Sequence, residues 1–257
     1  MTDIPNRAKT FIVAVMLIAA AVSVYAIGTR MPAGSREFLV LLAMALVAAR
    51  LKLTLPGFES NMSMNLPFML LAIAELSMPE AIAVGAASTF VQTLPRSGQT
   101  VKPAQAIFNV CNLINAIAIA SLAAGRALHF AALNKPFLIA AAALAFFLAD
   151  TLPVAGIISM TSPTKLFEVW SEMALMTFPY FVLSAGLAGI VAMGVQVIGW
   201  VAGGLALVVM VGVYRSFKFY FQGAKTVSLI VAPVSRGVAA ADYYRERPSM
   251  QESGPRA

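Results

Sequence analysis

The chain is a succession of apolar segments, most of them about as long as a bilayer requires. A helix needs about 20 apolar residues to cross the hydrocarbon core. Four of the segments contain no charged residue at all. Such a pattern predicts an all-α, polytopic helical membrane bundle with about eight transmembrane helices (seven are possible). The expected spans are residues 11–28, 37–53, 64–77, 79–94, 104–125, 137–159, 173–193 and 196–214.

The composition excludes the main alternatives to a membrane protein. Hydrophobic residues make up 60% of the chain and charged residues 11%, whereas soluble domains are about 25% charged. A soluble enzyme and a disordered protein are therefore excluded. A disulfide-stabilised secreted domain is excluded as well, because Cys111 is the single cysteine and can form no intrachain disulfide.

The third and fourth segments are short and lie close together. Between them stands Ser77-Met-Pro-Glu80, which has the spacing of a capping box with proline in the first turn. This motif predicts that a helix begins there. The pair forms either a tight hairpin or a re-entrant pair, which leaves the number of spans open.

The first apolar run allows two interpretations. Arg7 and Lys9 precede it, and Val24-Tyr-Ala26 faintly resembles a signal-peptidase site. The run is longer than the apolar region of most signal peptides, and further spans follow. We therefore expect a retained first helix, with a cleaved signal peptide as the alternative.

The basic residues predict the orientation of the chain. With eight spans and a cytoplasmic N-terminus, 14 of the 18 lysines and arginines fall on the inner side and 4 on the outer side, as the positive-inside rule requires. Without the C-terminal tail the split is 7 against 4. Both termini are expected in the cytoplasm of a bacterium, and the protein in its inner membrane. The outer four are Arg30, Arg36, Arg126 and Lys135.

This orientation divides the chain into three parts. Residues 1–10 form a cytoplasmic tail, residues 11–222 the transmembrane domain, and residues 223–257 a basic, partly disordered cytoplasmic tail. Two stretches, 163–172 and 214–222, mix aromatic and charged residues and are expected at the membrane surface. The net charge of +7 is therefore attributed to topology and anionic lipid rather than to nucleic acid.

A stripe of amide side chains marks the segment 104–125. Gln105, Asn109, Asn112 and Asn115 fall within an arc of about 120° on a helical wheel at 100° per residue. Such a stripe forms either one wall of a ligand-binding cavity or a set of hydrogen bonds between helices, which are worth about 0.6–2 kcal/mol each.

Two carboxyl groups complete the candidate ligand-binding cavity. Asp150 is the acidic residue deepest inside a long span, at a depth similar to that of Asn109 and Asn112. It either faces these amides or helps the helix accommodate Pro153. Glu75, at the outer end of its segment, lines a pocket or is simply solvated.

No catalytic machinery can be assembled from the sequence. The chain lacks a phosphate-binding loop, a dinucleotide-binding motif and a nucleophile elbow. One histidine and one cysteine cannot build a metal site of the usual His/Cys type. We therefore expect a protein that is not an enzyme and that needs neither a cofactor nor a metal.

From the third segment onward the chain resembles a family of bacterial sensor modules. These polytopic (MASE-like) modules stand at the N-termini of HD-GYP and GGDEF signalling proteins. The resemblance covers residues 36–222 and is moderately specific. It rests on Leu66-Pro-Phe-Met-Leu-Leu-Ala-Ile-Ala74, Pro79-Glu-Ala-Ile-Ala-Val-Gly85, Lys102-Pro-Ala-Gln-Ala-Ile-Phe-Asn-Val110, Asp150-Thr-Leu-Pro-Val-Ala155, Phe167-Glu-Val-Trp170, Pro179-Tyr180 followed by Gly186, and Tyr214-Arg-Ser216.

The resemblance implies a sensor of a ligand or of the membrane, with two departures. The family usually carries Asn where this chain has Asp150, and its members continue into an output domain. We therefore expect a non-catalytic module that binds a small ligand, a lipid or a partner helix, and that works with a partner protein or as a homo-oligomer. A weaker similarity, in Pro79–Gly85, is to the substrate-binding subunits of energy-coupling-factor transporters. A purely structural subunit is the third possibility.

Overall fold

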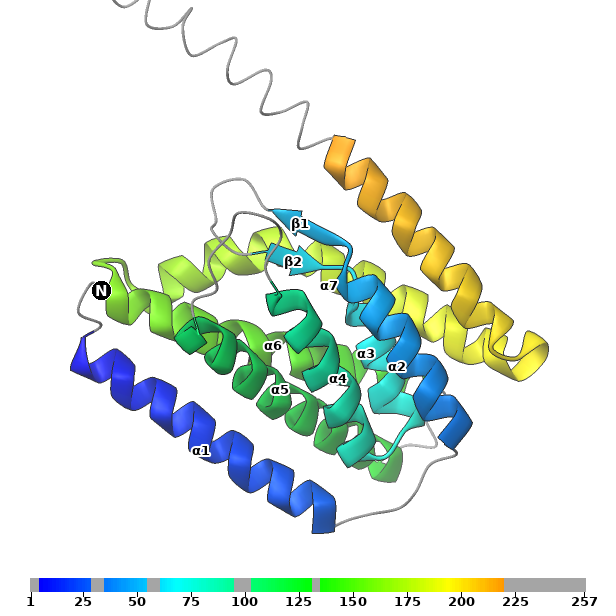
Figure 1. Ribbon diagram of the computed structural model, residues 1–257, viewed down its shortest axis with the longest axis horizontal. Coiled ribbons are helices and arrows are strands. Elements are labelled where there is room, and N and C mark those ends of the chain that lie inside the picture. Colours follow the sequence, from blue (N-terminus) through cyan, green and yellow to red (C-terminus); the bar gives the residue numbers. More distant parts are fainter. Residues whose placement is uncertain (1–4, 29–34, 55–60, 95–102, 131–134, 220–257) are drawn as a thin grey trace, which may run out of the picture.

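The computed structural model describes residues 5–28, 35–54, 61–94, 103–130 and 135–219, which contain eight helices (Figure 1). One pair of three-residue strands joins α2 to α3, with Lys52 opposite Ser63 in an antiparallel ladder. In chain order the elements are α1 (Asn6–Gly28), α2 (Ser35–Ala49), β1 (Lys52–Thr54), β2 (Asn61–Ser63), α3 (Leu66–Glu75), α4 (Met78–Thr93), α5 (Pro103–Phe130), α6 (Lys135–Thr161), α7 (Leu166–Ile198) and the last helix (Val201–Phe219).

Each helix covers one of the apolar segments predicted from the sequence. Five are long and apolar enough to cross a membrane: α1, α5, α6, α7 and the last helix. This confirms a helical multi-pass membrane protein. The helices α2, α3 and α4 have 15, 10 and 16 residues, or lengths of about 22, 15 and 24 Å at 1.5 Å per residue. The exact number of spans stays a prediction.

The short helix α3 lies at the centre of the bundle. Eight of its ten residues, Leu66 to Ile73, are buried, as expected for a helix that is apolar on every side. It contacts α2, α4, α5, α6 and α7. Its partner α4 begins with the predicted capping box, in which the Glu80 carboxylate accepts a hydrogen bond from the Ser77 backbone N–H at 3.1 Å.

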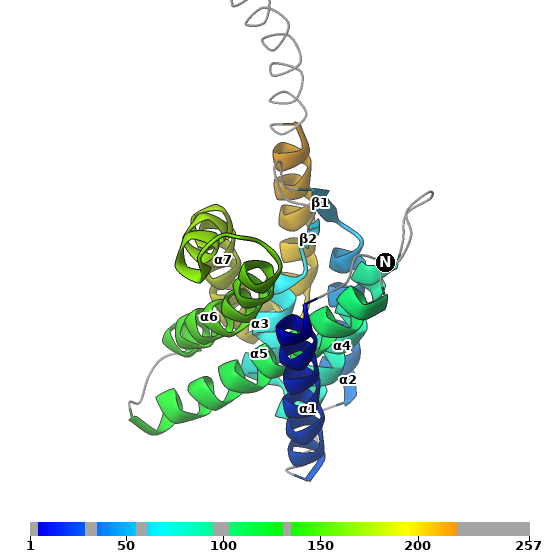
Figure 2. The same cartoon turned by 90° about the vertical axis from the view of Figure 1, so that its left-hand side faces the viewer.

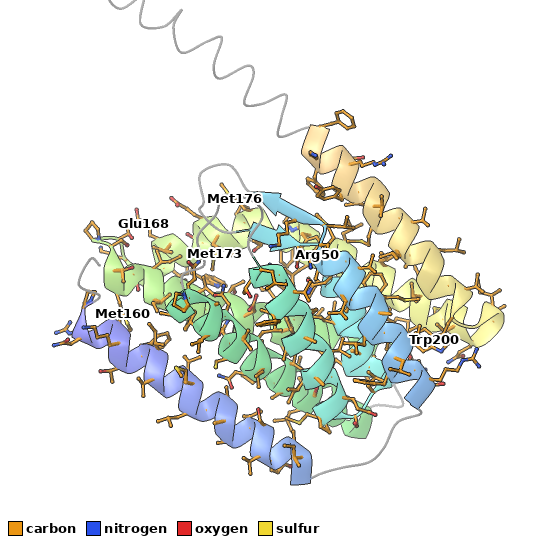
Figure 3. The ribbon with its side chains drawn as sticks, viewed as in Figure 1. Arg50, Met160, Glu168, Met173, Met176 and Trp200 are labelled. Carbon is orange, nitrogen blue, oxygen red and sulfur yellow. The ribbon has the colours of Figure 1, made fainter. Side chains whose placement is uncertain are left out.

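Contacts between distant residues define the two ends of the bundle. At one end the Lys52 ammonium donates to the Leu94 carbonyl at 2.8 Å, so the ends of α2 and α4 lie together. At the other end the Lys135 ammonium lies 2.9 Å from the Glu75 carboxylate, which joins the end of α3 to the start of α6. Figure 3 shows Arg50 beside the strands and Trp200 at the opposite end, where the last helix begins.

The first and last helices flank the bundle on opposite sides (Figures 1 and 2). In α1 only Ala8, Val15, Ala19 and Ala26 are buried, and α1 packs mainly on α5. The last helix approaches α2, where a Cβ placed on Gly203 would lie 2.8 Å from the Met44 methyl carbon. Both helices therefore present most of their apolar surface outward, as lipid-facing helices do.

The ends of α7 and of the last helix differ from the ends of the predicted spans 173–193 and 196–214. Residues 166–172 form the first turns of α7, because no helix-breaking residue stands between Trp170 and Met173, and their position at the membrane surface stays a prediction. Gly199 ends α7 with φ +62°, a conformation that glycine adopts without steric cost. Of the other surface stretch, 214–222, the part up to Phe219 continues the last helix, and residues 220–222, like the tail 223–257, lie outside the described residues.

Candidate functional site

The predicted contact between Asp150 and the amide stripe is present. The Nδ2 of Asn112, on α5, donates to Oδ1 of Asp150, on α6, at 3.0 Å and to the Asp150 backbone carbonyl at 3.0 Å. Asn112 is only 2% exposed, and its Oδ1 has no hydrogen-bond partner among the described residues. One amide therefore holds both the side chain and the main chain of Asp150.

The neighbouring turn of α6 adapts to Pro153. A proline inside a helix removes one backbone N–H and disturbs the turn before it. The Thr151 hydroxyl donates to the Phe147 carbonyl at 2.6 Å and accepts a hydrogen bond from Trp170 Nε1 of α7 at 3.1 Å. Asp150 therefore faces an α5 amide, as the first interpretation expected. Pro153 cannot donate to the carbonyl of Ala149, whereas the Thr151 hydroxyl bonds Phe147, so the second interpretation stays a prediction.

A second amide of the stripe binds α1. The Nδ2 of Asn115 donates to the Val15 carbonyl at 3.1 Å, and the rings of Phe11 and Phe108 lie 6.4 Å apart. Since residues 11 and 15 lie beside 108 and 115, α1 and α5 run parallel. Asn112 and Asn115 therefore both form hydrogen bonds between helices, as the second interpretation of the stripe expected.

An open groove lies between α1 and α5, with α4 at one side. Its volume is about 300 Å³, at the lower end of the range of small-molecule sites. Asn115 contributes an amide side chain to its wall, and the other lining residues are apolar or aromatic. The lining residues are Ile18, Ala21, Val22, Tyr25, Met78, Asn115, Ala118, Ile119 and Leu122.

The remaining predicted site residues lie elsewhere. Gln105 and Asn109 are exposed, and Glu75 forms an ion pair with Lys135, so its carboxylate is at the end of the bundle rather than beside Asp150. The structure thus brings Asn112 together with Asp150, puts Asn115 in the groove, and leaves Gln105, Asn109 and Glu75 outside both places.

The structure contains a buried polar cluster at the start of α3 that was not predicted from the sequence. The Tyr180 hydroxyl of α7 donates to the Ser63 carbonyl at 2.8 Å and accepts from the Leu66 N–H at 3.4 Å. Asn65 Nδ2 donates to the Ser88 hydroxyl at 3.1 Å, and the Ser63 hydroxyl bonds Asn65 and Gln92. The signal in the sequence is Asn61-Met-Ser-Met-Asn65, three polar residues alternating with methionine, which is the period of a strand.

The described residues contain no group of three or more His, Cys, Asp or Glu that could hold a metal ion. No protein-family model, curated protein or solved structure matches the chain. The class that the structure defines is therefore that of a helical multi-pass membrane protein, and its function is inferred from the groove and from the polar contacts inside the bundle.

Proposed function

We propose that this chain is a non-catalytic module of a bacterial inner membrane that binds an apolar, lipid-like ligand, and that it acts as a sensor or as a subunit of a larger complex. The observation that carries the proposal is the groove between α1 and α5, whose walls are almost wholly apolar. An apolar wall with few polar groups is the usual lining of a small-molecule site.

The shape of the groove favours one hydrocarbon chain as its occupant. Along α1 it extends from Ile18 to Tyr25, a rise of about 10 Å at 1.5 Å per residue. Its walls belong to two helices long enough to cross the membrane, so it opens sideways toward the lipid. An acyl chain from the bilayer can enter without crossing water.

Tyr25 gives the groove an amphipathic end. It stands in the last turn of α1 and is 58% exposed. Tyrosine is enriched where hydrocarbon meets water, because its ring is apolar and its hydroxyl is polar. A ligand with its polar group beside Tyr25 and its chain along Ile119 toward Asn115 would match the groove along its whole length.

The test uses a fatty acid that carries a photoactivatable diazirine, with the full chain in lipid nanodiscs. Labelled peptides are mapped by mass spectrometry. Ala21 lines the groove, whereas its neighbour Ala20 is also exposed but lies outside it. Labelling should concentrate on the groove residues, Ala21→Phe should reduce it several-fold, and Ala20→Phe should leave it unchanged.

Uniform labelling of all lipid-facing helices, unaffected by Ala21→Phe, would contradict a ligand site here. A module that purified in fixed stoichiometry with a membrane complex and showed that uniform labelling would instead be a structural subunit.

A further inference from the structure

The hydrogen bonds between Asn112 and Asp150 leave one acceptor without a donor. An asparagine side chain has two N–H donors and one carbonyl oxygen. Both donors of Asn112 go to Asp150, one to Oδ1 and one to the backbone carbonyl. The Oδ1 of Asn112 is buried and has no partner among the described residues.

The orientation of this amide is fixed by the main chain. If its oxygen and nitrogen were exchanged, the amide oxygen would face the Asp150 backbone carbonyl, which can only accept hydrogen bonds. The unpaired atom of Asn112 is therefore an acceptor, and it requires a donor.

An ionised Asp150 cannot supply that donor. A carboxylate only accepts hydrogen bonds, whereas a protonated carboxyl group has one O–H to donate. The neutral acid would thus give Asn112 Oδ1 a donor from a group that already contacts the amide. The two side chains would then be joined by two reciprocal hydrogen bonds.

The position of Asp150 also favours the neutral form. It lies 11 residues from the end of α6, about 16 Å at 1.5 Å per residue, which is near the middle of a hydrocarbon core about 30 Å thick. A charge there is costly unless it is paired. On α6, Lys135 forms an ion pair with Glu75 of α3. Asp150 has no cationic partner among the described side chains.

The elements packed against α6 bring no opposite charge to this depth. The stretch of α5 from Pro103 to Gly125 has no charged residue. Phe11 of α1 lies against Gly156, so the basic residues before Phe11 lie still further toward the end of α6. The charged residues of the packed helices are Arg7 and Lys9 of α1, Glu168 and Glu172 of α7, Glu75 of α3 and Arg126 of α5. Arg126 stands 14 residues beyond Asn112 on α5, about 21 Å along the helix at 1.5 Å per residue.

We propose that Asn112 and Asp150 form a proton-binding site inside the membrane, in which Asp150 is the neutral acid and joins α6 to α5. Binding takes up one proton on the carboxylate, with no other bond changed. Release of the proton leaves a carboxylate that holds α5 only through the Asn112 N–H groups, beside an amide oxygen without a donor. The α5–α6 contact next to Pro153 is therefore weaker in the deprotonated form. This site is separate from the groove.

The direct test is infrared spectroscopy of the full chain in nanodiscs at neutral pH. A protonated carboxyl group has a C=O stretch well separated from the bands of a carboxylate. The chain has only three aspartates, Asp3, Asp150 and Asp242, so aspartate labelled with ¹³C at its carboxyl carbon gives a simple spectrum. We expect an isotope-shifted band of a protonated carboxyl that disappears in Asp150→Asn. Absence of this band in the unmodified protein would overturn the proposal.

Stability gives an independent readout. Asparagine at position 150 offers an N–H donor to Asn112 and an oxygen in place of Oδ1, so Asp150→Asn should keep the thermal midpoint of the unmodified protein. Asp150→Leu can make neither bond and should lower the midpoint by several degrees. If Asp150→Asn lowers the midpoint as much as Asp150→Leu does, the carboxylate is the form that the fold requires and the proposal is wrong.

Discussion

At the scale of single residues, the polar side chains of this protein connect elements far apart in sequence. Tyr180 is 4% exposed, and its hydroxyl joins α7 to the last residue of β2 and the first residue of α3, through the Ser63 carbonyl and the Leu66 N–H. The start of α3 is buried, so these backbone groups have no access to water. Tyr180 therefore satisfies main-chain groups that would otherwise be unpaired.

Tyr180→Phe should destabilise the protein by about 1–3 kcal/mol, the usual cost of leaving a buried backbone group unsatisfied. The measurement is denaturant or thermal unfolding in one detergent. Tyr25→Phe is the matched control, because Tyr25 is exposed, and it should unfold like the unmodified protein. Equal stability of Tyr180→Phe and the unmodified protein would show that the hydroxyl contributes nothing to the fold.

The sequence predicted polar contacts well where the pattern was local. The capping box at Ser77 and Glu80 needs only three residues of spacing, and it is present. The amide stripe and Asp150 could be proposed as partners because both lie at similar depth on consecutive spans. The Tyr180 contacts bridge 114 and 117 residues, and no periodicity within one segment indicates such a pairing.

At the scale of elements, glycines set how closely helices approach. On α4, a Cβ placed on Gly85 would clash with Cδ1 of Ile117 and lie 3.1 Å from Cδ2 of Leu113, both on α5. The helices α4 and α5 are therefore in close contact at this point. A larger side chain at position 85 must therefore displace the side chains of Ile117 and Leu113.

Gly85→Leu should lower the stability by about 1–3 kcal/mol through overpacking. A Cβ placed on Gly125, on α5, would meet no atom within 4 Å, so Gly125→Leu serves as the control. The unfolding midpoints of both variants, measured together, check this. A Gly85→Leu variant as stable as the control would mean that α4 and α5 are not in contact there.

The last helix contains two neighbouring glycines that serve as a test position and its control. Gly203 faces Met44 of α2, with 2.8 Å between its Cβ position and the methionine methyl, whereas Gly204 faces open space. Gly203→Leu must displace the Met44 side chain, so it should loosen the contact of the last helix with α2 and speed hydrogen exchange of the amides in 201–219. Gly204→Leu should not change the exchange, and equal effects of the two substitutions would contradict this packing.

The apolar pattern predicted where the helices lie along the chain, but it did not predict where each helix begins and ends. The predicted seventh span began at residue 173, after the charged and aromatic residues, whereas α7 begins at Leu166. Its first turns are held by packing, since Trp170 bonds Thr151 and its ring lies 6.5 Å from that of Phe147. The short strands were not predicted either: they arise from the pairing of β1 with β2, and the strand-like alternation in residues 61–65 covers only five residues.

At the scale of the whole molecule, the contacts require the helices to alternate in direction. The ends of α2 and α4 meet through Lys52 and Leu94, and the end of α3 meets the start of α6 through Glu75 and Lys135. The end with the strands is the one where the basic residues gather, such as Arg50 and Lys165. The positive-inside rule predicts that this end faces the cytoplasm, so both termini are expected there.

Cysteine accessibility in intact cells tests the membrane topology most directly. Cys111 is the single native cysteine, so Cys111→Ala gives a background in which each new cysteine reports alone. Arg36 stands in the first turn of α2, and Thr164 lies between α6 and α7 at the opposite end; both are exposed. With a membrane-impermeant maleimide, Arg36→Cys should react in intact cells and Thr164→Cys only after permeabilisation. Reaction of both from the outside, or recovery of the protein in the soluble fraction, would contradict the account.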